Sequence, residues 1–148
     1  MEKYLMQTIT GCIGAEGLAV LFNVRQKHLW IIAAASVLSW LSYAACMLCN
    51  TGVFWAFFCG TAVAALISEI LARFVRVPVL LLLVPILIPL IPGSDLYHMM
   101  SNLVRGQESE MMHFARLLLQ EAGAIALGII CTASVTSIFM GIKHRKRP

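Results

Sequence analysis

The chain has 148 residues, of which 60% are hydrophobic and only 12% are charged. Because soluble domains contain about 25% charged residues, this composition excludes an ordinary soluble domain and indicates an integral membrane protein. The net charge of +4 predicts no nucleic-acid partner, since the basic residues lie in short segments beside apolar stretches, where they are typical of contact with the anionic headgroups of a lipid bilayer.

Five apolar stretches are long enough to cross a hydrocarbon core about 30 Å thick, given a helical rise of about 1.5 Å per residue. They comprise residues 5–22, 28–48, 53–74, 77–92 and 117–140. Only two to five residues separate the first four stretches from one another. The sequence therefore predicts an all-α integral membrane protein, with one transmembrane domain over residues 1–148 built as a bundle of five helices.

Glu16 lies near the middle of the first stretch, on a helix that also carries Gly11, Gly14 and Gly17. An ionisable side chain inside a membrane is costly unless it is paired, neutral or hydrated, so a functional role is its first interpretation. The glycines allow another helix to approach closely. We expect Glu16 to face a substrate or to carry a coupling proton.

Cys46 and Cys49 in the second stretch have the spacing of a redox or metal pair. We interpret them as packing residues, because such a site would need a second pair or nearby histidines. Ser68 and Glu69 are adjacent, but they point about 100° apart on a helix and do not form a nucleophile–base dyad. We therefore predict no enzymatic activity, no metal and no cofactor.

Glu69 near the end of the third stretch is followed four residues later by Arg73. This spacing is typical of a helical ion pair. A structural ion pair and a role in proton coupling both remain open for Glu69. A stripe of small or polar side chains, which predicts close helix packing, runs beside it and comprises Thr61, Ala65, Ser68 and Ala72.

The fourth stretch is apolar enough for a bilayer, yet residues 77–93 contain four prolines, namely Pro78, Pro85, Pro89 and Pro92. An internal proline lacks an N–H group and clashes with the carbonyl four residues earlier, so we expect the carbonyls of Leu81, Pro85 and Ile88 to lose intrahelical partners. Broken backbone at membrane depth is tolerated where it is buried in protein or lines a cavity, as in transporter binding sites. The pattern indicates transport.

Residues 93–116 form the one long connection. Ser94 or Asp95 is expected to cap a short interfacial helix over residues 96–105, and Gly106 is expected to end it. Glu121 lies near the outer end of the fifth stretch, where we interpret it as a carboxylate at the membrane surface.

The basic residues predict the orientation. With the N-terminus outside, the cytoplasmic segments hold eight Lys and Arg residues against three outside. This bias predicts five crossings of the cell (inner) membrane with a cytoplasmic C-terminus, residues 141–148 forming a basic tail.

Several blocks resemble the threonine/serine exporter family across nearly the whole chain. They are residues 22–24 (FNV), 68–73 (SEILAR), 84–93 (VPILIPLIPG) with Tyr97, and 123–128 (GAIALG). The PxxPG element followed by Tyr97 is the specific part. Arg25 departs from the pattern, since a proline commonly follows FNV. The chain is most similar to the short membrane subunit of the split, two-component branch.

The resemblance implies secondary export of small carboxylate metabolites, either threonine and serine or a dicarboxylate such as succinate. It also implies a larger exporter-family membrane subunit as partner. We hypothesise that the segment around Pro85, Pro89, Pro92 and Gly93 forms part of the substrate site, because helix N-termini and freed N–H groups attract carboxylates.

In this mechanism Glu16 or Glu69 carries the coupling proton. Candidate polar contacts are Asn23, Ser68 and Tyr97. The alternative is an accessory or scaffold subunit that stabilises a partner transporter without transporting anything itself.

Overall fold

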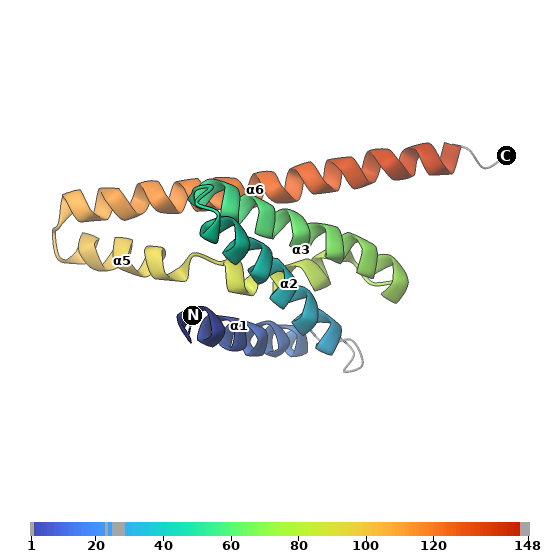
Figure 1. Cartoon of the computed structure of the whole chain (residues 1–148), viewed down its shortest axis with the longest axis horizontal. Helices are drawn as coiled ribbons and strands as arrows, with labels where there is room; N and C mark the ends of the chain where they lie inside the picture. Colours follow the sequence, from blue (N-terminus) through green and yellow to red (C-terminus); the bar gives the residue numbers. More distant parts are fainter. Residues whose placement is uncertain (1, 23, 25–28, 146–148) are drawn as a thin grey trace.

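The computed structural model describes residues 2–22, 24 and 29–145, and within these residues every regular element is helical. In chain order the elements are α1 (Glu2–Leu21), α2 (Leu29–Leu48), α3 (Val53–Val75), α4 (Val79–Leu87), the 3₁₀ turn η2 (Ile88–Leu90), α5 (Gly93–Val104) and α6 (Glu108–Arg145). Figure 1 shows α6 as one long helix that passes the whole bundle.

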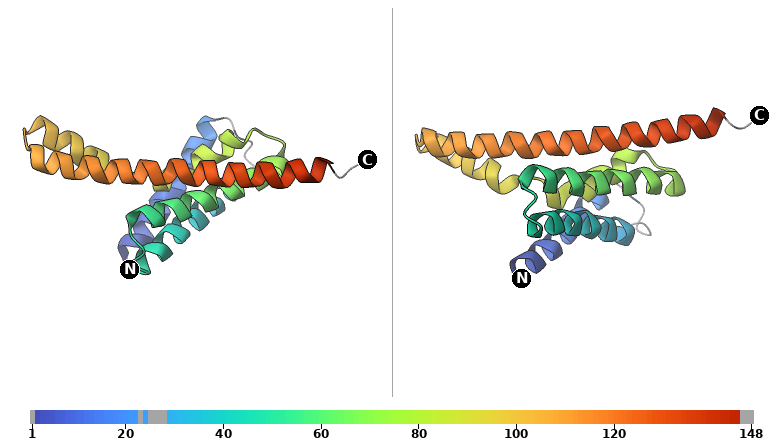
Figure 2. Two further views of the ribbon diagram at one scale, coloured as in Figure 1. Left: turned by 90° about the horizontal axis from the view of Figure 1, so that it is seen from above. Right: turned by 45° about the horizontal axis from the view of Figure 1, so that its top comes forward.

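The helices lie in a layered order, with α6 beside α3, α3 beside α2, and α2 beside α1. The right-hand view of Figure 2 shows the same order. The α4 helix and η2 contact α1, α2 and α3, so the proline-rich segment lies among these three helices. The α5 helix packs beside the first half of α6, and the two form a hairpin that projects beyond the other helices.

Three helices are long and apolar enough to cross a membrane, namely α2, α3 and residues Glu108–Ile138 of α6. A fourth crossing results if Val79–Leu90 and Gly93–Val104, which meet at a bend of 63°, count as one span. The apolar part of α1, Thr8–Leu21, is shorter than these helices. The structure thus supports three or four crossings where the sequence predicts five.

The predicted long connection over residues 93–116 is largely helical, which corrects its interpretation as a loop with one short helix. The α5 helix begins at Gly93, and its N-cap Pro92 provides no side-chain hydrogen bond, so the predicted Ser94 or Asp95 cap is wrong. Gly106, at φ 69°, adopts the left-handed backbone that glycine tolerates. It follows the end of α5, as the sequence predicts, and lets the chain turn back into α6.

Small side chains allow the helices to pack closely. The larger core cluster consists mostly of alanine with leucine and isoleucine: Ala15, Ala19, Ile32, Ala35, Ala64, Ala65, Ala72, Leu82, Leu83 and Ile86. Such residues are typical of membrane interfaces, where close backbone contact rather than expulsion of water holds helices together. Gly128 serves the same purpose, because an added Cβ would lie 3.0 Å from the Phe58 carbonyl oxygen of α3.

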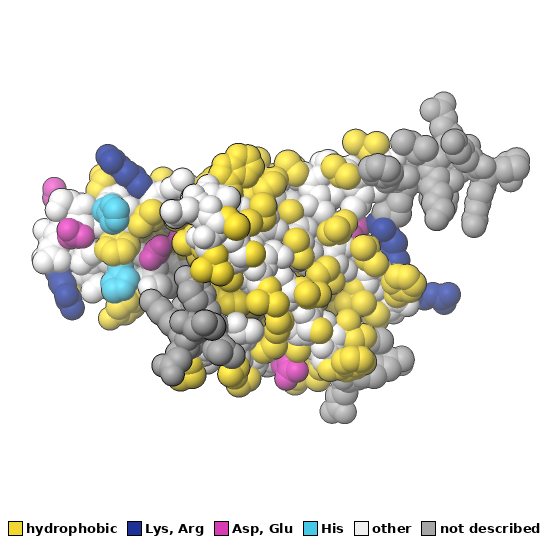
Figure 3. Space-filling model, viewed as in Figure 1, with side chains coloured by type: hydrophobic (Ala, Val, Ile, Leu, Met, Phe, Trp, Pro, Cys, Tyr) yellow, Lys and Arg dark blue, Asp and Glu magenta, His cyan; other side chains and the backbone are white. Residues whose placement is uncertain are grey.

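Charged side chains gather at the two ends of the molecule. Figure 3 shows acidic, basic and histidine side chains on the projecting α5–α6 hairpin and basic side chains at the opposite end, with hydrophobic side chains predominating between them. At this opposite end, the exposed Arg73 lies in the last turn of α3 and the exposed Arg76 lies at its C-cap. This distribution suits a helical bundle that crosses a bilayer with its two polar ends in water.

Candidate functional site

Glycines of α1 make room for the turn that interrupts the proline-rich helix. A Cβ added at Gly11 would lie 3.0 Å from the Cβ and Cγ atoms of Pro89, and one added at Gly14 would lie 3.2 Å from Cγ2 of Ile88. These distances are shorter than ordinary van der Waals contact. The turn η2 therefore packs against a surface of α1 that only glycine can provide.

Gly60 of α3 provides the same room on the other side of the turn. An added Cβ there would lie 3.2 Å from Cδ2 of Leu90, the last residue of η2. Leu90 is 2% exposed and packs in a second cluster of buried residues with Trp40 of α2, Phe57 of α3 and Ala124 of α6. The buried side of the interrupted helix thus lies at the meeting point of several helices, while Leu80, Val84 and Ile91 are exposed.

The 3₁₀ geometry supplies partners for two of the three carbonyls that we expected to lose them. The N–H of Ile88 donates to the Pro85 carbonyl, and the N–H of Ile91 donates to the Ile88 carbonyl at 3.2 Å. The expectation is wrong for these two carbonyls. The residue four positions later is a proline without an N–H group, but in a 3₁₀ turn the carbonyl accepts instead from the N–H three positions later. Ile91 is then extended, at φ −69° and ψ 122°, before α5 begins.

Three buried polar atoms near this region have no hydrogen-bond partner among the described residues: Trp40 Nε1, Thr61 Oγ1 and Glu121 Oε2. They come from α2, α3 and α6. Trp40 belongs to the second cluster, Thr61 follows Gly60, and Glu121 precedes the clustered Ala124 by one turn. A buried polar group without a partner costs free energy, so such groups mark places where a water, an ion or a solute is expected.

Glu121 is 5% exposed, so its interpretation as a carboxylate at the membrane surface is wrong. The α6 helix begins at Glu108, well before the predicted start of the fifth span, and α5 packs alongside it. The side chain of Asp95 in the first turn of α5 interacts with that of Glu121. The sequence contained a sign of this burial. Glu121, Ala124 and Gly128 are spaced three and four residues apart, so the glutamate shares one helical face with two small residues that favour close packing.

The acidic residues predicted to act are not brought together with the interrupted helix. Glu16 is exposed on α1. Glu69 Oε2 accepts a hydrogen bond from Nη2 of Arg73 at 2.7 Å, with their side chains 18% and 46% exposed. The geometry fits the ion-pair interpretation of Glu69, while its role in coupling stays a prediction.

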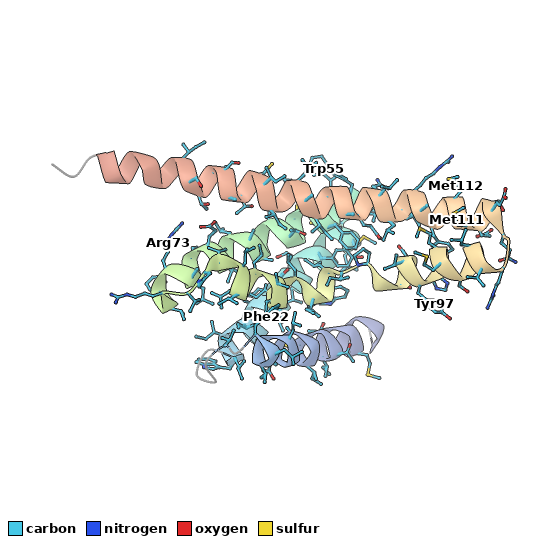
Figure 4. The ribbon with its side chains drawn as sticks, turned by 180° about the vertical axis from the view of Figure 1, so that it is seen from behind. Phe22, Trp55, Arg73, Tyr97, Met111 and Met112 are labelled. Carbon is cyan, nitrogen blue, oxygen red and sulfur yellow. The ribbon has the colours of Figure 1, made fainter. Side chains whose placement is uncertain are left out.

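The remaining predicted site residues have varied surroundings. Pro85 is buried in α4, while Gly93 is exposed at the start of α5. Tyr97 is 67% exposed, and Figure 4 shows it at the opposite end of the bundle from Arg73. The buried hydroxyl of Ser68 donates to the Ala64 carbonyl of its own helix at 2.7 Å.

The half-buried Pro89 and Pro92 flank the break. Asn23 and Arg25 lie outside the described residues.

The five cysteines are free thiols, and Cys46 of α2 lies beside Cys59 of α3 rather than pairing with Cys49. Within the part of the chain that the structure describes, no group of three His, Cys, Asp or Glu side chains is placed to hold a metal ion. A groove of about 350 Å³ runs between α3 and α6 and is lined almost entirely by apolar atoms. Its lining residues come from α3 and α6, and none of them is charged.

These features define a helical membrane protein whose interior is built around an interrupted helix and a few unpaired polar groups. The family model described as Threonine/Serine exporter, ThrE, matches residues 7–135, so the chain belongs to the threonine/serine exporter family. The match confirms the resemblance seen in the sequence, and it includes the break, Asp95 and Glu121. No curated protein and no solved structure matches the chain.

Proposed function

We propose that this chain is a subunit of a secondary transporter that exports small carboxylate metabolites, either threonine and serine or a dicarboxylate such as succinate. Membership of the exporter family supports this activity. The structural observation that carries the proposal is the interrupted helix, packed among α1, α2 and α3 beside unpaired polar atoms. Interrupted helices of this kind form binding sites in transporters because their backbone groups are available to a solute.

The proposed substrate route passes the break at Pro85, Pro89, Pro92 and Gly93. The first N–H groups of a helix carry partial positive charge, so the start of α5 at Gly93 suits the carboxylate of a substrate. Ser68 and Tyr97 are proposed as polar contacts along the route, as is Asn23. The proposed export is coupled to protons, with Glu16 or Glu69 as proton carriers predicted from the sequence.

We infer five crossings of the cell membrane, with α4 and α5 together forming the fourth. The N-terminus and the α5–α6 hairpin lie at one end of the bundle in Figure 1, and the C-terminus lies at the other. Arg73 lies in the last turn of α3 and Arg76 at its C-cap, and this end of α3 lies on the same side of the bundle as the end of α6. This arrangement supports an outside N-terminus and a cytoplasmic C-terminus, because cytoplasmic ends carry the excess of basic residues.

A larger membrane subunit of the same family is the proposed partner, as in the split branch. The exposed position of Glu16 in the apolar part of α1 supports it. An ionisable side chain facing lipid is costly, so a protein surface covering this side of α1 would remove the cost. Gly17 beside it is open, with nothing within 4 Å of an added Cβ, which leaves space for such a surface.

The function is tested by straightening the break. Alanine at both Pro89 and Pro92 restores two N–H donors and allows a continuous helix, so we expect the double variant to insert but to lose export from loaded cells. Pro78→Ala is the matched control, because Pro78 precedes α4 and is exposed. Full export by a stably inserted double variant would refute the proposed route.

A further inference from the structure

Asp95 and Glu121 meet where the start of α5 packs against α6. Glu121 is 5% exposed, and its Oε2 atom has no hydrogen-bond partner in the described part of the chain. Asp95 is half-buried, and its carboxyl group interacts directly with that of Glu121. Two acidic groups therefore lie together where water has little access.

Among the residues whose side chains the structure describes, no Lys or Arg is placed to neutralise this pair. The described parts of α2, η2 and α5 contain no Lys or Arg. On α3 the charged residues are Glu69 and Arg73, near its far end, and on α6 the closest basic residue, Arg116, is exposed. The pair thus lacks the cation that would favour two ionised carboxylates.

Two other titratable side chains approach from the neighbouring helices. Tyr43 of α2 packs against the cluster that contains Ala124, one turn after Glu121. His98 of α5 lies one turn after Asp95, is exposed, and stacks on Phe114 of α6 with ring centroids 5.1 Å apart. Tyrosine carries no positive charge, and the exposed His98 is not a permanent cation, so neither supplies the pair with a fixed positive charge.

A further unpaired donor belongs to the second cluster, which contains Ala124 one turn after Glu121. Trp40 is 8% exposed, packs against Ala124, and its Nε1 has no partner among the described residues. An indole N–H can only donate, and a carboxylate oxygen accepts. This second unpaired group is independent of the acidic pair and, like Glu121 Oε2, marks a place where a water, an ion or a solute is expected.

We propose that Asp95 and Glu121 share one proton and form a further proton-binding site of this exporter, in addition to the carrier Glu16 or Glu69. Two adjacent carboxyl groups away from water cannot both ionise readily, so they are most stable with one proton between them. The role in export rests on the proposed proton-coupled transport, whereas the shared proton itself does not.

The position of the pair connects it to the break. Asp95 lies in the first turn of α5, directly after the extended residue Ile91 and Pro92. A second negative charge there opposes a substrate carboxylate at the N-terminus of α5, and protonation removes that opposition. The charge state of the pair therefore changes the affinity of the break for a carboxylate, which couples proton binding to substrate binding.

The shared proton is tested by infrared spectroscopy of the full-length chain purified with its membrane partner, because a protonated carboxyl group absorbs separately from a carboxylate. We expect a protonated-carboxyl band near neutral pH that disappears in Glu121→Gln. Glu108→Gln, an exposed glutamate in the first turn of the same helix, is the matched control and should keep the band. A wild type without this band, or a band that survives in Glu121→Gln, overturns the proposal.

Asp95→Asn covers the case in which Glu121→Gln fails to insert. It removes the neighbouring charge at a half-buried position, so the proton should leave Glu121 at a lower pH than in the wild type. An unchanged titration of the band contradicts a shared proton.

The role in export is tested in everted vesicles from native membranes that contain the full-length chain, using labelled threonine and labelled succinate separately. An imposed pH gradient should drive substrate movement in the wild type and in Glu108→Gln. Glu121→Gln should lose this gradient-driven movement but retain exchange of labelled for unlabelled substrate. Equal gradient-driven movement in Glu121→Gln overturns the inference. If the wild type moves neither substrate, the proposed function is refuted instead, and the infrared result alone decides the shared proton.

Discussion

Replacing Gly11 with alanine should loosen the contact that holds the interrupted helix in place. The added Cβ would lie 3.0 Å from two atoms of the Pro89 ring and 3.7 Å from its Cα atom. A proline ring cannot swing aside as a long side chain does, so α1 or η2 must shift. Overpacking of this kind costs about 1–3 kcal/mol.

Gly17→Ala is the matched control, because the same helix has nothing within 4 Å of an added Cβ at that position. Alanine gains about 0.5–1 kcal/mol over glycine inside a helix, and this gain cancels between the two variants. The difference between them therefore isolates the contact with Pro89. A cost of about 1–3 kcal/mol corresponds to roughly a 5- to 150-fold change in an equilibrium constant, since about 1.4 kcal/mol is tenfold.

Hydrogen–deuterium exchange measures the local opening directly. The amides of Ile88 and Ile91 donate the 3₁₀ hydrogen bonds of this region, so their exchange reports how often the turn opens. We expect exchange to be about 5- to 150-fold faster in Gly11→Ala than in Gly17→Ala, following the same conversion. Equal exchange in the two variants would show that the glycine surface of α1 does not hold η2, which would refute the packing argument.

Three further variants test other contacts. Gly128→Ala places a Cβ 3.0 Å from a backbone oxygen of α3, whereas a Cβ added at Gly123 has nothing within 4 Å. We expect Gly128→Ala to lower the thermal stability of the purified protein by about 1–3 kcal/mol and the control Gly123→Ala not to lower it. Glu69→Gln breaks a partly exposed ion pair with Arg73 and should cost less than about 1 kcal/mol, a larger loss in thermal unfolding being inconsistent with this. Trp40→Phe removes an unpaired N–H but keeps an aromatic ring. The stability of the protein should therefore be unchanged or higher by up to about 1–3 kcal/mol, while export should fall. Full export by this variant would show that Trp40 is not part of the site.

Local signals in the sequence are sufficient for the second and third helices. The predicted ranges, 28–48 and 53–74, agree with Leu29–Leu48 and Val53–Val75 to within a residue at each end. Both are uninterrupted apolar runs, and the turn between them contains Asn50 at φ 57° and Gly52 at φ 95°. These residue types tolerate left-handed backbone, so the turn is visible in the sequence.

The extent of the last helix could not be predicted from apolar length. The apolar run begins near residue 117, but the helix begins at Glu108, because the polar residues before the run contain no proline or glycine to interrupt it. Apolar length identifies the part of a helix that suits lipid, and it does not identify where the helix begins. The α5–α6 hairpin was missed for this reason.

The roles of the acidic residues depend on contacts between segments that are distant in the sequence. Glu16 and Glu121 both lie in apolar runs, yet Glu16 is exposed and Glu121 is buried. Burial of Glu121 follows from α5 folding back along α6, which also places Asp95 beside it. Helical periodicity can show which residues share a face, but it cannot show which face another helix covers.

The central claim, that the interrupted helix of this chain lines the substrate route, is tested most directly by photocrosslinking a substrate analogue in native membranes and mapping the label. We expect label on residues 85–97, reduced when unlabelled substrate is present. Label confined to a partner subunit, with none on this chain, would contradict the claim and favour an accessory subunit that only stabilises the transporter.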